Sequence, residues 1–102
     1  MKKVLFTFLA IFTMLTAYAQ FPGWGPQSKV VTDSIYSKIL DANRQFTIYL
    51  PQSYEVDATR KYPILYLLHG MSGVNTSWFN DQRCKDVMDQ LTASGEACEM
   101  II

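Results

Sequence analysis

The residues best suited to chemistry follow an apolar run, residues 64–68, where His69 and Gly70 open a loop of small and polar residues that extends to residue 79. Glycine lets a chain turn sharply and lets its backbone approach a ligand closely. The N–H group of the next residue, Met71, is then free to point into a pocket. Free N–H groups at a strand end stabilise the oxyanion that develops in acyl transfer.

Other reactive side chains are few and scattered. Ser72 and Ser77 lie in the loop, but no Gly-x-Ser-x-Gly sequence surrounds either one, so we interpret them as loop or cap hydroxyls. The single histidine and the two separated cysteines, Cys84 and Cys98, do not form a metal-ligand cluster. The sequence therefore predicts no metal site and no cofactor.

The elements that must position the loop are a hairpin, a strand and a helix. Residues 30–40 and 44–50 alternate between apolar and polar types, which predicts a β-hairpin with a turn at residues 41–43. Residues 64–68 are continuously apolar, which is typical of a central strand of a parallel sheet with both faces covered.

A helix is expected to follow from residue 80 to residue 93. Asn80 or Asp81 would cap its start, and Ser94 and Gly95 would end it. Residues 100–102 begin another apolar run, so the order predicts most of a βαβ unit in an α/β fold. A hairpin and one such unit bury little surface, so we expect the N-terminal part of a longer protein.

Residues 1–19 have the pattern of a secretory signal peptide. Lys2 and Lys3 precede an uncharged apolar run, and a small-x-small cleavage site ends at Ala19. We therefore expect a secreted or periplasmic protein, with cleavage after Ala19, a linker at residues 20–28 and no membrane attachment afterwards. Disulfides are permitted in such a compartment. Cys84 and Cys98 could pair across the helix, but their separation favours unpaired thiols.

Four segments together resemble the secreted esterase family of the α/β-hydrolases, which includes feruloyl esterases, acetyl xylan esterases, S-formylglutathione hydrolases and mycolyltransferase antigens. "YSKILDANRQFTIYLPQSY" resembles the first hairpin of that family. "KYPILYLLHGMSGVNTSWF" resembles its third strand and oxyanion loop. "DVMDQLTASGE" and "EMII" resemble its first helix and the start of its next strand. The resemblance implies that residues 29–102 are the N-terminal part of an α/β-hydrolase domain: an antiparallel hairpin leading into a mostly parallel sheet flanked by helices.

The resemblance also implies roles for individual residues. The Met71 backbone N–H would be one oxyanion donor, Gly70 would form the turn beside the substrate, and Trp78 would line the substrate site or pack under the loop. The catalytic histidine of the family lies near the C-terminus, so His69 is expected to be a structural imidazole that hydrogen-bonds the loop backbone. Many relatives have two glycines where this chain has Ser72 and Gly73.

The nucleophile, acid and base of the triad do not occur in these 102 residues, so this chain alone is expected to be inactive. The leading hypothesis is a secreted serine-type ester hydrolase acting on acetyl or feruloyl esters of plant polysaccharide. One alternative is another class of α/β-hydrolase, such as a peptidase or an acyltransferase. The other is a non-catalytic carbohydrate-binding or interaction module that uses Trp24 and Trp78. The formal net charge is zero, so no nucleic-acid partner is predicted, and the oligomeric state is left open.

Overall fold

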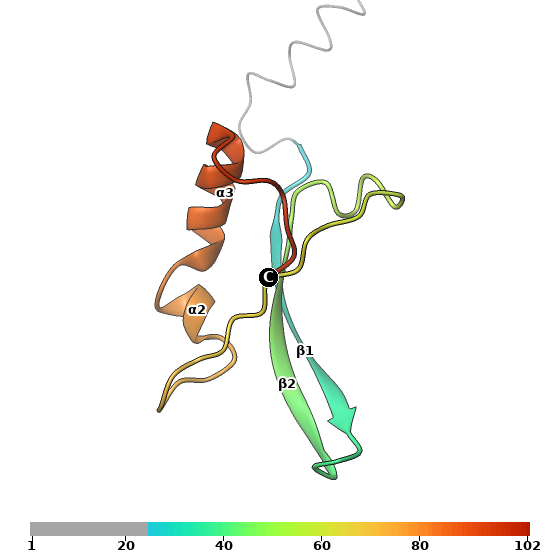
Figure 1. Cartoon of the computed structure of the whole chain (residues 1–102), viewed down its shortest axis with the longest axis vertical. Coiled ribbons are helices and arrows are strands. Elements are labelled where there is room, and N and C mark those ends of the chain that lie inside the picture. The colour runs from blue at the N-terminus through green and yellow to red at the C-terminus, as the bar shows by residue number, and fades with distance from the viewer. Residues whose placement is uncertain (1–24) are drawn as a thin grey trace, which may run out of the picture.

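The computed structural model describes residues 25–102, in which a hairpin and two helices are joined by long extended segments. The elements are β1 (Lys29–Ser37), β2 (Ala42–Leu50), α2 (Ser77–Asn80) and α3 (Cys84–Ser94). Figure 1 shows the hairpin running downwards from the centre of the molecule and α3 standing beside its upper half. The predicted signal peptide and most of the predicted linker lie outside the described residues.

The two strands form an antiparallel pair whose register runs from Lys29 opposite Leu50 to Ser37 opposite Ala42. The hairpin is therefore confirmed, but the predicted turn at residues 41–43 was wrong, because the connection lies at residues 38–41. Asp41 ends this connection with a left-handed φ of 47°, and its carboxylate accepts a hydrogen bond from the hydroxyl of Tyr36. Aspartate adopts this conformation more readily than most residues, so strand pairing resumes at Ala42.

The last residues of the sequence lie between the hairpin and the segment that leads into the apolar run. Tyr49 and Ile102 exchange both main-chain hydrogen bonds, at 2.8 and 3.2 Å, which is the pattern of an antiparallel pair. On the other side, Ile101 N–H donates to the Pro63 carbonyl at 3.0 Å and Leu65 N–H donates to the Ile101 carbonyl at 2.9 Å. These bonds make a parallel bridge between Ile64 and Ile101.

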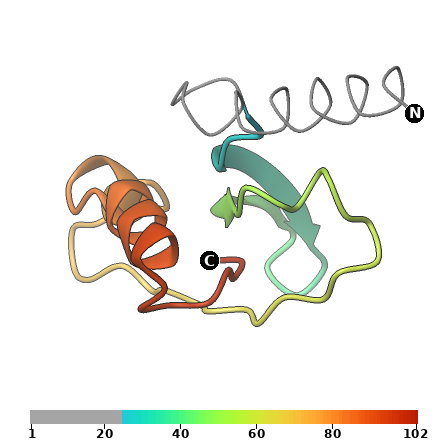
Figure 2. The same ribbon diagram turned by 90° about the horizontal axis from the view of Figure 1, so that it is seen from above.

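The spatial order is therefore β1, β2, residues 101–102 and residues 63–65, and Figure 2 shows the C-terminus enclosed in this way. The predicted extended segment after the helix is confirmed, with α3 in the crossover between the two parallel segments. The predicted covering of residues 64–68 was wrong for this chain, because Tyr66 is 81% exposed and Leu68 87% exposed. Residues 101–102 pair with the beginning of this run, and of residues 66–68 only Leu67 is half-buried.

The long helix starts later than predicted. Asn80 and Asp81 belong to the end of the short helix α2, and Arg83 then takes a left-handed conformation, with φ of 52°, before α3 begins. The predicted end is confirmed, since Gly95 follows the helix with φ of 77°, a conformation that suits glycine. Met88 on α3 is 7% exposed and, with Tyr49, forms the small apolar core of the described residues.

Both cysteines are free thiols, as predicted. Cys84 is the first residue of α3, and partial burial raises the pKa of its thiol. Cys98 is exposed in the segment after the helix.

A polar cluster fastens the long loop of residues 51–61 to the segment after α3. The Glu99 carboxylate accepts hydrogen bonds from the backbone N–H and the hydroxyl of Ser53, at 3.1 and 2.7 Å. Arg60 pairs with the same carboxylate at 2.7 Å, and its guanidinium also lies over the Tyr62 ring. The Glu99 side chain is 13% exposed, so these partners compensate a carboxylate that is largely removed from water.

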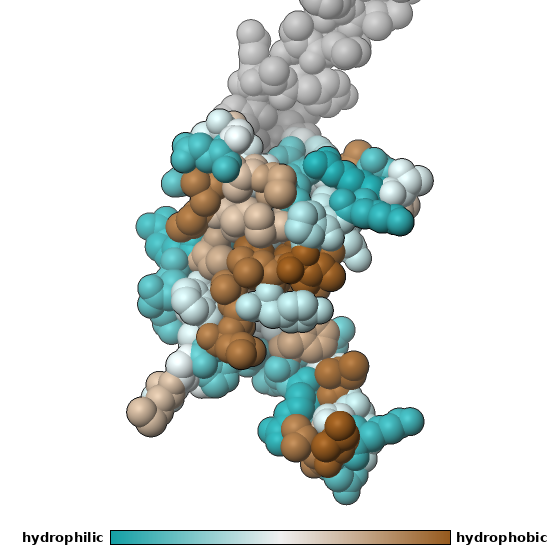
Figure 3. Space-filling view, in the orientation of Figure 1, coloured by the Kyte–Doolittle hydropathy of each residue, from teal (hydrophilic) through white to brown (hydrophobic). Residues whose placement is uncertain are grey.

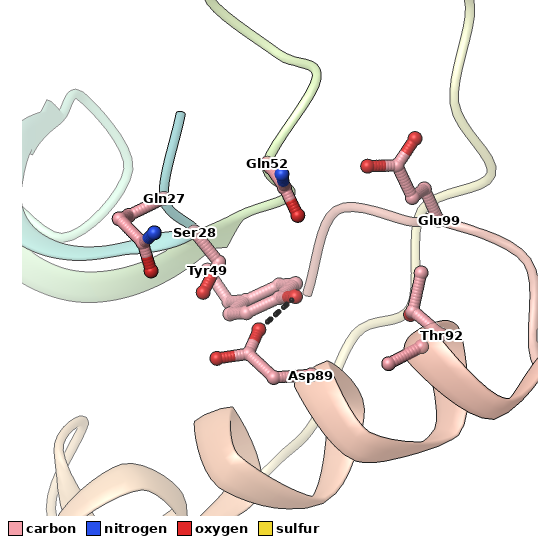
Figure 4. Close-up of a pocket in the computed structure, with 8 residues that line it drawn as sticks. Gln27, Ser28, Tyr49, Gln52, Asp89, Thr92 and Glu99 are labelled. Atoms are coloured by element: carbon pink, nitrogen blue, oxygen red, sulfur yellow. Dashed lines mark hydrogen bonds between the residues drawn. The ribbon is translucent and has the colours of Figure 1, made fainter. Parts of the chain in front are cut away.

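A second polar contact joins β2 to α3. The Tyr49 side chain is 2% exposed, and its hydroxyl donates to the Asp89 carboxylate at 2.8 Å (Figure 4). Lys85 donates to the other oxygen of Asp89 at 2.6 Å. Burial alone would raise the pKa of Asp89, but hydrogen bonds from Lys85, Ser28 and Tyr49 outweigh it and hold the pKa below its usual range.

We predict that Asp89→Asn lowers the free energy of unfolding by about 1 kcal/mol at neutral pH, because the charge-assisted bonds to Tyr49 and Lys85 are weakened at a partly exposed site. The carboxyl pKa is lower in the folded state than in the unfolded chain. The ionised carboxylate therefore contributes to the free energy of unfolding at pH values above its pKa in the unfolded chain, about 3.9. This contribution is lost as the pH falls through the folded-state pKa.

Urea unfolding of the wild-type protein and the Asp89→Asn variant at neutral and acidic pH checks this prediction. The difference between their free energies of unfolding should become smaller in acid. Asp86→Asn is the matched control, since Asp86 lies on the same helix as Asp89 and pairs with exposed Arg83, which precedes the helix. An equal loss in both variants would contradict a special role for Asp89.

Candidate active site

The His-Gly loop, residues 69–76, projects from the molecule between the apolar run and α2, towards the lower left in Figure 1. Its tip is a tight turn, closed by a hydrogen bond from Gly73 N–H to the Gly70 carbonyl at 3.0 Å. Ser72 has a left-handed φ of 70°, whereas Met71 is not among the residues with positive φ. This combination is the φ pattern of a type II turn, with Met71 and Ser72 at its two central positions.

The special backbone positions of the loop are therefore Ser72 and Gly73 rather than Gly70. Gly70 is not left-handed, and a Cβ added to it would meet nothing within 4 Å. A Cβ on Gly73 would lie 2.9 Å from the His69 Cβ and 3.1 Å from the Gly70 carbonyl oxygen. Ser72 occupies the position where a type II turn favours glycine, so this chain keeps the turn at some cost in backbone strain.

Side chains on either side of the turn hold its backbone in place. The His69 Nδ1–H donates to the Gly70 carbonyl at 2.9 Å, which confirms the structural imidazole expected from the sequence. Because a carbonyl oxygen can only accept, this bond places a proton on Nδ1. Trp78, the second residue of α2, donates its indole N–H to the Leu68 carbonyl at 3.2 Å. This hydrogen bond links α2 to the end of the apolar run, and the Trp78 side chain remains partly exposed.

Met71 lies at the outermost part of the turn, where its side chain is 99% exposed. In the described part of the chain, its N–H does not join the ladder between strands and has no main-chain acceptor. The donor that an oxyanion would need is therefore free. Its role as a donor stays a prediction, because Met71 lines neither of the two hollows described below.

A hollow of about 1180 Å³ lies between β2, the apolar run and α2. Apolar side chains gather over this region in Figure 3. His69 and Trp78 line it, whereas Gly70 and Met71 do not. Two of its walls are backbone edges, β2 and residues 64–68, and residues 101–102 occupy the beginning of the space between them. Because residues 101–102 pair with both edges, the hollow continues the position that a strand would occupy between β2 and residues 64–68.

A smaller pocket of about 240 Å³ lies between β2 and α3, lined by Tyr49, Asp89 and Glu99 among others (Figure 4). Burial, followed by the hydrogen bond to Asp89, raises the pKa of the Tyr49 hydroxyl, so this group stays protonated and donates. Both carboxylates already have hydrogen-bonding partners. The pocket is therefore a structural junction between the strand and the helix.

Comparison with known proteins places these elements in a family. The sequence profile of a family described as "Putative esterase" matches residues 37–102, which include the second half of the hairpin, the His-Gly loop and α3. The chain belongs to this esterase family.

A solved structure of a ferulic acid esterase is 58% identical in sequence to this chain. The match covers 74% of this chain, with a TM-score of 0.73. Endo-1,4-beta-xylanase Y of Acetivibrio thermocellus is 31% identical over 78 residues, or 76% of the chain. The predicted fold class is thus confirmed as the α/β-hydrolase type. The chain spans 30% of the ferulic acid esterase chain and 7% of the xylanase.

The candidate site in this chain is therefore limited to one strand end and its loop. No Gly-x-Ser-x-Gly sequence occurs in the 102 residues, so a nucleophile elbow is not among the groups that the structure brings together. Sequence reasoning identified Gly70 and Met71 from the His-Gly pair, but it gave no conformational role to Ser72 and Gly73. The feature of the sequence that could have indicated their roles is the pair of small residues, Ser72 and Gly73, because such residues are common in tight turns.

We predict that Gly73→Ala loosens the His-Gly loop, because its methyl group cannot be accommodated between His69 and the Gly70 carbonyl without a shift of the backbone. Gly70→Ala is the matched control, since its methyl group would face open space. Hydrogen–deuterium exchange of the peptide that covers residues 69–76 should rise in the Gly73 variant and stay near the wild-type rate in the Gly70 variant. Equal exchange in both variants would contradict this account of the turn.

Proposed function

We propose that the protein carrying this chain is a serine-type carboxylic ester hydrolase acting on acetyl or feruloyl esters of plant polysaccharide. Membership of the esterase family and 58% identity to a ferulic acid esterase support the reaction class. The similarity to a xylanase supports a plant cell-wall context. The triad would come from residues outside this chain, which supplies the oxyanion loop.

The observation that carries the proposal is the unpaired N–H of Met71 at the end of the apolar run. In the proposed reaction, a serine attacks the ester carbonyl, and a histidine takes its proton. Negative charge then develops on the carbonyl oxygen, and the Met71 N–H donates to it. A second donor would follow the nucleophile in the sequence. Such donors act without reorganisation, because the turn already fixes their direction.

We further propose that the protein is exported, with cleavage of the signal peptide after Ala19. The charged start, the apolar run and the small-x-small site support this. Within residues 25–102, no helix has the length and hydropathy that a membrane crossing requires.

We predict that Met71→Pro in the full-length protein lowers kcat on methyl ferulate by about 10²–10³, the usual cost of losing one oxyanion donor. Proline lacks an N–H, yet the first central position of a type II turn favours it, so the turn itself should be kept. Met71→Ala retains the N–H and should lose far less activity. Steady-state kinetics on methyl ferulate and p-nitrophenyl acetate, with a thermal melt of each variant, provide the measurement.

Equal activity of the proline and alanine variants would show that the Met71 N–H is not the donor. A full-length wild-type protein that cleaves neither ester would reject the proposed function. Peptide cleavage or acyl transfer by that protein would then favour another α/β-hydrolase class, and retention on insoluble xylan without turnover would favour a binding module.

A further inference from the structure

Three hydrogen bonds meet at the start of the His-Gly loop, and two of them end on one atom, the Gly70 carbonyl oxygen. This oxygen accepts from His69 Nδ1–H at 2.9 Å and from Gly73 N–H at 3.0 Å. One residue earlier, the Leu68 carbonyl accepts from the Trp78 indole at 3.2 Å. The loop is exposed, so water could satisfy each of these carbonyls instead. Their bonds to protein groups therefore serve to fix direction.

The Gly70 carbonyl and the Met71 N–H belong to the same peptide unit. This unit is planar, and the described residues contain no cis peptide bond. In a trans peptide the C=O and N–H vectors point in opposite directions. Whatever holds the Gly70 oxygen therefore also sets the direction of the Met71 N–H, on the side away from His69 and Gly73.

We propose that His69 is a positioning residue for ester hydrolysis, which aims the Met71 N–H by holding the carbonyl of the same peptide unit. This inference rests on the proposed function and deepens it. The turn bond from Gly73 alone leaves the peptide plane able to rock about the chain. The imidazole supplies the second point of attachment, and hydrogen bonding at the carbonyl also polarises the peptide so that its N–H donates more strongly.

The imidazole is itself held in place. Gly73 lies so close to His69 that an added Cβ would be 2.9 Å from the His69 Cβ and 3.2 Å from its Cγ. The absent side chain at residue 73 therefore leaves the space that the base of the histidine side chain occupies. His69 does not touch the reacting atoms in this arrangement, which separates its role from that of a general base.

The test compares His69→Asn with His69→Leu in the full-length protein. The two replacements have the same branched shape, but only asparagine carries an N–H donor near the position of Nδ1. We expect the leucine variant to lose about tenfold in kcat on methyl ferulate, less than the 10²–10³ typical of losing a donor outright, with KM changed by less than about threefold. The asparagine variant should recover to within about threefold of the wild-type kcat.

Equal losses in the two variants, no loss in the leucine variant, or a loss confined to KM would overturn the proposal. A second readout does not depend on activity. With ¹⁵N-methionine labelling, the Met71 amide resonance should move in the leucine variant and stay close to its wild-type position in the asparagine variant. If the wild-type protein cleaves no ester, the proposed function fails. The Met71 resonance still decides whether His69 orients the peptide.

Discussion

Two residues at the end of the sequence hold the described structure together. Ile101 and Ile102 make four main-chain hydrogen bonds, two to Tyr49 on β2 and two to the segment of Pro63 and Leu65. Without them, the hairpin and the segment that carries the His-Gly loop would share no ladder. The apolar core is small, so these directional bonds, together with the bond from Asn75 of the loop to the Thr47 hydroxyl on β2, set the relative positions of the hairpin and the loop.

The polar contacts of the fold support the same junction. Tyr49, whose backbone pairs with Ile102, also sends its hydroxyl to Asp89 on α3. Glu99, shortly before Ile101 and Ile102, accepts a hydrogen bond from Ser53 and forms an ion pair with Arg60, both in the loop that precedes the apolar run. The strand, the helix and the loop are thus fastened around one short segment. The His-Gly loop leaves this junction on an extended arm, and its own hydrogen bonds, not burial, give its tip a defined geometry.

The sequence predicted what depends on local chemistry. The alternating strands and the glycine that ends the helix follow from local conformational preferences, whereas the roles of Ser72 and Gly73 in the loop were not predicted. The turn at residues 38–41 and the late start of α3 were missed, because each depends on a non-glycine residue in a left-handed conformation, Asp41 and Arg83. The exposure of residues 64–68 was also missed, since continuous hydrophobicity reports what a strand could bury and not which neighbours the described chain provides. Within the site, the His-Gly pair identified Met71 and a histidine that bonds the loop backbone, but the sequence did not show that the acceptor is the Gly70 carbonyl.

The bond between Ser53 and Glu99 joins residues that are 46 positions apart in the sequence, and the pair of Tyr49 and Ile102 is separated by even more residues. A ribosome adding about 5–20 residues each second would release the hairpin seconds before its partners exist. During that interval the second edge of β2 has no strand beside it, and the loop after it has no carboxylate to gather around. Assembly of this region therefore depends on residues 99–102, and until that segment is in place the hairpin can pair with the wrong strand.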